Sequence, residues 1–103
     1  MGSTRTPRRV AAAAVALGEN VRTWRKLLTL TAEELSDRAG VSVPTLRRIE
    51  SGNPGVSFES VARVLLILGR LEALVETTDP YETDLGRARA DQVLPQRVRR
   101  SRS

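Results

Sequence analysis

Residues 30–51, LTAEELSDRAGVSVPTLRRIES, predict two short helices joined by a tight turn. Thr31 followed by Glu34 has the form of a capping box, in which each side chain satisfies a free backbone amide at the start of a helix. Gly40 can adopt the positive φ that ends such a helix sharply. We therefore expect the first helix to run from Thr31 to just before Gly40.

Only residues 40–42 separate this helix from the second one. Ser42 is a suitable N-cap, so we expect the second helix to begin directly after it. Pro44 falls at the second helical position, where the backbone amide would have no partner within the helix. Leu46 and Ile49 are three apart and predict the buried face of this helix. The sequence Gly-Asn-Pro-Gly at 52–55 ends it.

A longer helix is predicted before this pair, with apolar residues at spacings of four, three and four. The alanines that precede this stripe favour an extension back to about Val10. A single aromatic residue on an apolar stripe is far more often packed than used to stack on bases, so we expect Trp24 to be packed. The stripe consists of Leu17, Val21, Trp24 and Leu28.

Two more helices are predicted after the pair. Ser57 is the expected cap of the first, and Gly69 separates the two. The buried stripe of the first is Val61, Val64, Leu65 and Leu68, and the apolar residues of the second are Leu71, Leu74 and Val75. Because no strand pattern occurs, the expected fold is all-α, with five helices and flexible basic tails at both ends.

The expected organisation is a basic flexible segment at 1–14, a folded domain at 15–78 and an arginine-rich tail at 79–103. The net charge is +5, but residues 15–79 carry eight basic and nine acidic side chains, so the basicity lies in the tails. From Arg87 onward there are too few hydrophobic residues to offset the ordering entropy, which predicts disorder in the unbound protein.

The composition excludes several kinds of chemistry. The chain has no cysteine and no histidine, which removes disulfides, thiolate zinc sites and Cys–His or Ser–His nucleophile pairs. We therefore expect no catalytic residue, metal or cofactor, and the protein is not expected to be an enzyme. No apolar run approaches the roughly 20 residues of a membrane span, so we expect a soluble, cytoplasmic protein with no membrane partner.

Residues 30–51 resemble the Xre/phage-repressor-like helix-turn-helix family, and the resemblance extends to about residue 76. It implies that the helix beginning after Ser42 lies in the major groove of DNA, with its first residues against base edges. An arginine there can pair bidentately with guanine. The DNA-binding residues expected on this basis are Thr31, Ser42, Val43, Pro44, Thr45, Arg47, Arg48, Asn53 and Ser57.

Two observations leave the DNA contacts open. Arg47 or Arg48 could instead be a solvated charge or pair with Glu50 or another carboxylate. The sequence also departs from the family at Ala32, where a glutamine that contacts DNA is common, and at Thr29, where glycine is common. Readout from the first helix of the pair is therefore expected to be weak.

Residues 46–57, LRRIESGNPGVS, look like the small antitoxin-type regulators related to HipB, which are commonly encoded beside HipA-like kinase toxins. This resemblance implies a dimeric autorepressor on a palindromic operator that also neutralises a toxin, with the tail binding either the toxin or phosphates. The alternatives are a stand-alone Xre-type transcriptional regulator and a protein-interaction module that has lost DNA binding. The apolar faces are also wider than one small core needs, which indicates either fuller burial or a dimer or partner surface; the residues that widen them are Leu27, Leu28, Leu66 and Ile67.

Overall fold

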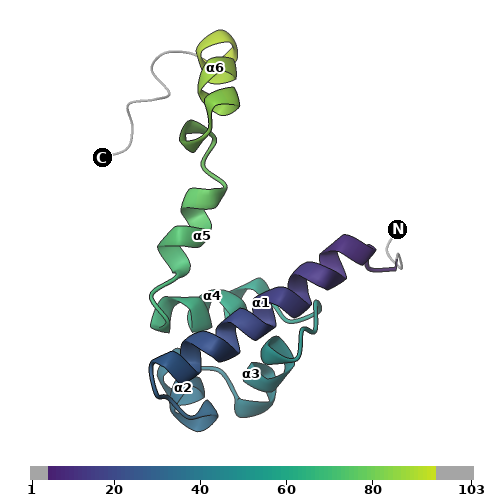
Figure 1. Ribbon diagram of the computed structural model, residues 1–103, viewed down its shortest axis with the longest axis vertical. Coiled ribbons are helices and arrows are strands. Elements are labelled where there is room, and N and C mark those ends of the chain that lie inside the picture. Colours follow the sequence, from purple (N-terminus) through teal and green to yellow (C-terminus); the bar gives the residue numbers. More distant parts are fainter. Residues whose placement is uncertain (1–4, 95–103) are drawn as a thin grey trace. The chain divides into compact units, whose positions relative to one another are not determined.

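The computed structural model describes residues 5–94, and this part of the chain is helical without any strand (Figure 1). This part of the chain divides into two compact units, with the boundary between Leu71 and Glu72. The predicted all-α fold is confirmed, although the described residues form six α-helices rather than five. They are α1 (Arg8–Leu27), α2 (Ala32–Ala39), α3 (Val43–Glu50), α4 (Phe58–Ile67), α5 (Leu71–Thr77) and α6 (Asp84–Val93), with a 3-10 turn at Pro80–Glu82.

The core of the first unit is formed by one apolar face from each of α1 to α4. Its largest fully enclosed side chains are one from each helix: Val21, Leu35, Leu46 and Val64. The predicted buried face of α3 is confirmed, since Ile49 is also buried. In α4, Leu65 and Leu68 are buried as predicted, whereas Val61 is only half-buried. Helix α3 contacts α1, α2 and α4, so its buried face is held by all three neighbours.

Glycines allow α1 and α3 to approach closely. A Cβ placed on Gly18 of α1 would lie 2.3 Å from the carbonyl oxygen of Ile49, which is far inside van der Waals contact. Gly52, with φ +85°, lies directly against Val15. The middle of α1 therefore packs on the last turn of α3 and on the residues that follow it, and this contact orients α3.

Helix α1 begins at Arg8, so residues 8–14 are helical and the expected flexible segment at 1–14 is wrong for this part. The alanine run supplies high helix propensity. Val15 is fixed in place by its contact with Gly52, which gives the helix a tertiary anchor that sequence spacing did not reveal. Residues 1–4 lie outside the described part of the chain.

The last turn of α1 is less buried than its apolar stripe predicted. Leu28 is 43% exposed and Trp24 is 36% exposed. The guanidinium of Arg70 lies over the Trp24 ring, 5.3 Å from its centroid, so the indole is a surface cation–π partner and the prediction that it is packed in the core is corrected. Helical spacing defines a face but does not show how far the neighbouring helices cover it.

The second unit contains α5 from Glu72 onward, the 3-10 turn and α6. Within the described residues, α5 buries no side chain and α6 buries only Ala90. The expectation of disorder from Arg87 onward is wrong as far as Val93. Local contacts explain the helix: Thr83 caps it by accepting from the Gly86 amide at 2.9 Å, and Arg87 donates to the Tyr81 carbonyl at 2.6 Å. The final arginines lie beyond the described residues.

Candidate nucleic-acid interface

The turn between α2 and α3 is built by local hydrogen bonds. The Thr31 hydroxyl accepts from the Glu34 amide at 3.0 Å, and the Glu34 carboxylate accepts from the Thr31 amide at 2.8 Å, which confirms the capping box. Gly40 has φ +74° and ends α2 in the left-handed conformation. Ser42 then caps α3 by accepting from the Thr45 amide at 3.1 Å. The predicted pair of helices and its turn are confirmed.

Three polar side chains are connected along the outer face of α3. The Ser42 hydroxyl donates to the Thr45 hydroxyl oxygen at 2.9 Å, and the Arg48 guanidinium donates to the same oxygen at 3.1 Å. We call Ser42, Thr45 and Arg48 the α3 polar row. A hydroxyl oxygen has two lone pairs, and both of those on Thr45 are used. The Thr45 hydroxyl hydrogen therefore remains available to donate outward.

None of the residues expected to contact DNA is buried within the first unit. Val43 and Thr45 are half-buried, and the others are exposed. The exposed ones are Thr31, Ser42, Pro44, Arg47, Arg48, Asn53 and Ser57. Because Leu46 and Ile49 are enclosed on the opposite side of α3, the helix presents one buried face and one polar face.

Glu50 at the end of α3 is fully engaged by Arg25 of α1. The Arg25 Nε and Nη2 donate to the two Glu50 carboxylate oxygens at 2.7 and 3.1 Å, and Nη1 donates to the Leu30 carbonyl at 3.1 Å. The side chains of this pair are only 13% and 12% exposed. The hydrogen bond with Glu50, opposed by desolvation, raises the pKa of Arg25 above its ordinary value.

This ion pair decides one question that the sequence left open. Both oxygens of Glu50 are occupied by Arg25, so pairing of Arg47 or Arg48 with Glu50 is wrong. Arg25 itself was not identified as a structural residue, because it lies 25 positions from its partner and no local pattern connects them.

Arg47 has only a loose partner. Its Nη2 lies 3.9 Å from the Glu33 carboxylate of α2, beyond hydrogen-bonding distance, and the two side chains are 66% and 70% exposed. Exposed pairs of this kind contribute about 0–1 kcal/mol. Arg47 is therefore held weakly and can be redirected to another anion at little cost.

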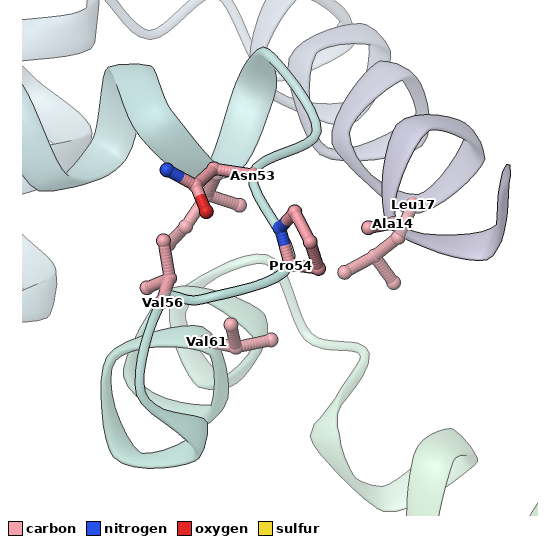
Figure 2. A pocket seen from close by; sticks show the side chains of 7 residues that line it. Ala14, Leu17, Asn53, Pro54, Val56 and Val61 are labelled. Carbon is pink, nitrogen blue, oxygen red and sulfur yellow. The ribbon is translucent and has the colours of Figure 1, made fainter. Parts of the chain in front are cut away.

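The loop after α3 is held by an internal turn and by an apolar recess. Asn53 Oδ1 accepts from the Gly55 amide at 2.7 Å, which leaves the side-chain NH2 of Asn53 for an outside partner. Pro54 faces Ala14 and Leu17 of α1 across a recess of about 120 Å³ (Figure 2). The walls of this recess are mostly apolar, so it provides packing for the loop rather than converging chemical groups.

The start of α4 repeats the pattern of a capped helix end. Ser57 Oγ accepts from the Ser60 amide at 3.1 Å, as its expected role as a cap requires. The acidic residue in this first turn, Glu59, is paired with Arg63 at 2.9 Å. The amino end of α4 is therefore not left with an unbalanced negative charge.

Within residues 5–94 there is no cluster of acidic side chains that could hold a metal ion. In the same part of the chain, none of the helices combines the length and the hydropathy needed to cross a bilayer.

A family model described as a helix-turn-helix domain matches residues 16–77, which is more than half of the chain. The chain belongs to the helix-turn-helix domain family. The matched residues of this helix-turn-helix protein include α2, the turn and α3, together with α4 and most of α1. Membership supports a DNA-binding regulator, in a family that is typically non-enzymatic. No match was found among curated proteins or among solved structures.

Proposed function

We propose that this helix-turn-helix protein is a sequence-specific transcriptional regulator that places α3 in the major groove of DNA. The observation that carries the proposal is the α3 polar row, which lies on the exposed face of the helix. The carboxylate nearest to it along α3, Glu50, is already neutralised by Arg25. The guanidinium of Arg48 is therefore available to a base edge.

The chemistry of the row favours hydrogen-bond acceptors in the groove. Arg48 spends one donor on Thr45 and keeps the others, which suits the O6 and N7 atoms of guanine. The outward hydrogen of Thr45 suits a second acceptor on a neighbouring base. Val43, half-buried at the first position of α3, offers an apolar contact for a thymine methyl group.

Contacts to the DNA backbone are proposed at the capped ends of the neighbouring helices, where free amides and the helix dipole attract phosphates. Glu33 and Glu34 lie in the first turn of α2 and weaken the attraction at Thr31. At Ser57 the only acidic residue of the first turn, Glu59, is paired. Ser57 and the free amide group of Asn53 are therefore the stronger candidates for phosphate contacts.

A dimer is part of the proposal, with the two copies of α3 separated by about 34 Å, one turn of DNA. Large apolar side chains support it: Phe58 is 70% exposed, Leu27 66% and Leu66 55%. A core of this size also gains stability from association. Sedimentation equilibrium gives a direct test, and a strictly monomeric chain at the concentrations at which it binds DNA would oppose the dimer.

The finer role that we propose is that of an antitoxin and autorepressor. Its support is the likeness of residues 46–57 to regulators related to HipB, so a HipA-like kinase is the proposed protein partner. The product of the adjacent gene provides the test: a kinase-like protein that co-purifies with the chain supports the antitoxin role. An unrelated neighbour would favour a stand-alone regulator of the Xre type.

DNA binding is tested by footprinting on the region upstream of the protein's own gene. Arg48→Ala should weaken binding to the protected sequence roughly 5- to 150-fold, the value of one bidentate arginine–guanine contact, and should weaken binding to random DNA far less. Lys26→Ala removes one exposed positive charge from α1 and serves as the matched control. Absence of any protected sequence would favour the interaction module that has lost DNA binding.

A further inference from the structure

A second recess lies between α1 and the end of α3. It has a volume of about 250 Å³ and is open to solvent. Three of its five lining side chains are arginines. The lining residues are Arg22 and Arg25 of α1, Arg47 and Glu50 of α3, and Ser51 immediately after α3.

The charges in this recess do not balance. Arg25 and Glu50 neutralise each other through two hydrogen bonds. Arg22 makes no hydrogen bond or ion pair with any residue in the range 5–94, and Arg47 reaches only to 3.9 Å from Glu33. The recess therefore carries two guanidinium groups whose charge is not cancelled within its walls.

Arg22, which is unpaired among the described residues, and Arg47, which is only loosely paired with Glu33, bring up to ten N–H donors and a charge of about +2 to one recess, with mutual repulsion between them. The complementary ligand is a compact anion with several acceptor oxygens. A phosphate meets this description, because each arginine can bind two of its oxygens side by side. Ser51 contributes no donor to such a ligand, because its hydroxyl hydrogen is donated to the Arg48 carbonyl at 3.1 Å, so the two arginines carry the recognition.

We propose that this recess binds a backbone phosphate of the DNA duplex, an inference that rests on the DNA binding proposed above. Helix α3 has eight residues and is about 12 Å long, similar to the width of the major groove. When the α3 polar row faces the base edges, the far end of so short a helix is within reach of the phosphates that border the groove. Arg22, which sequence reasoning did not identify, then contributes from α1.

The test uses a fluorescent duplex of random sequence, because a phosphate contact does not require the operator. The slope of log K against log salt is measured by anisotropy from about 50 to 200 mM KCl. Arg22→Gln and Arg47→Gln should each reduce the steepness of this slope, and neither by more than about 0.9, the value of one phosphate contact. The double variant should lose about 0.9 in total, since both arginines bind one phosphate.

Lys26→Gln is the matched control, because it removes a charge from the same helix without lining the recess. Equal changes in slope for Lys26→Gln and Arg22→Gln would overturn the inference in favour of a general charge effect. A loss of about 1.8 in the double variant would overturn it by assigning the arginines to two phosphates. Arg22 makes no hydrogen bond or ion pair with the described residues, so Arg22→Gln should not destabilise the fold. An unchanged circular dichroism spectrum verifies that the variant is folded.

Two further outcomes separate the sources of phosphate and the two proposals. The first outcome concerns inorganic phosphate, which is compared with chloride of equal ionic strength for its effect on the melting temperature of the wild-type chain. If phosphate raises this temperature, and Arg22→Gln abolishes the increase but leaves the DNA slope unchanged, the ligand is a free phosphate group. That result would overturn the duplex site. If Arg48→Ala lowers sequence discrimination but Arg22→Gln changes nothing, only the recess fails. A wild-type chain that binds no duplex overturns both proposals.

Discussion

Replacement of Gly18 by alanine tests how the orientation of α3 is fixed. The new methyl carbon would stand 2.3 Å from the Ile49 carbonyl oxygen and 2.8 Å from that of Glu50. Ordinary contacts of this kind are about 3.5 Å, so α1 and α3 must separate by roughly 1 Å or their backbones must bend. The obstructing atoms are backbone carbonyls, which cannot rotate away as a flexible side chain would.

Two effects of opposite sign determine the size of the change. Alanine is about 0.8–1.0 kcal/mol better than glycine within a helix, which favours the variant. Overpacking of a tight contact costs about 1–3 kcal/mol, and a backbone obstacle places this contact at the upper end. We therefore expect Gly18→Ala to lower the free energy of unfolding by about 1–2 kcal/mol, equivalent to a fall in melting temperature of roughly 4–15 °C.

Thermal and urea unfolding followed by circular dichroism measure this change. Ala16→Gly is the control, because Ala16 is exposed on the same helix and reports the propensity effect alone, a loss of about 1 kcal/mol. If Gly18→Ala instead stabilised the protein by about 1 kcal/mol, propensity would be the only effect and the close contact between α1 and α3 would be refuted.

Two further predictions concern the caps and the buried ion pair. Ser42→Ala should cost about 1 kcal/mol of stability and also reduce base discrimination, since Ser42 both caps α3 and holds Thr45. Ser57→Ala should cost a similar amount of stability but leave base discrimination as it is in the wild type. If both variants showed the same base discrimination, the role of the α3 polar row would be contradicted. Glu50→Gln should lower the free energy of unfolding by about 2–3 kcal/mol in urea, because it leaves the half-buried charge of Arg25 without a counter-charge. A variant as stable as the wild type would show that Arg25 finds water instead.

The elements that could be predicted from sequence are those decided within a few residues. The caps at Thr31, Ser42 and Ser57 and the left-handed turn at Gly40 all depend on hydrogen bonds or backbone angles of adjacent positions. The cap at Thr83 is of the same kind, and the Thr-Asp sequence at 83 and 84 was an available signal. Hydrophobic periodicity, the usual guide to helices, is weak in that segment and does not predict α6.

The candidate site was predicted only in part for the same reason. The apolar spacing of Leu46 and Ile49 predicts the buried face of α3, and therefore that Arg48 is exposed and that Thr45 is not enclosed. The recess that contains Arg22 could not be predicted, because it exists only where two helices from different parts of the chain lie together.

The amino-acid sequence by itself determined the pair of short helices, the turn between them and the face of α3 that points outward, since hydrogen bonds and helical periodicity act over a few residues. Only the tertiary structure decided which charges remain available on that face. Arg25 reaches Glu50 across 25 positions, and Gly18 admits the backbone of α3. Such contacts depend on how helices meet in space, which local spacing in the chain does not specify.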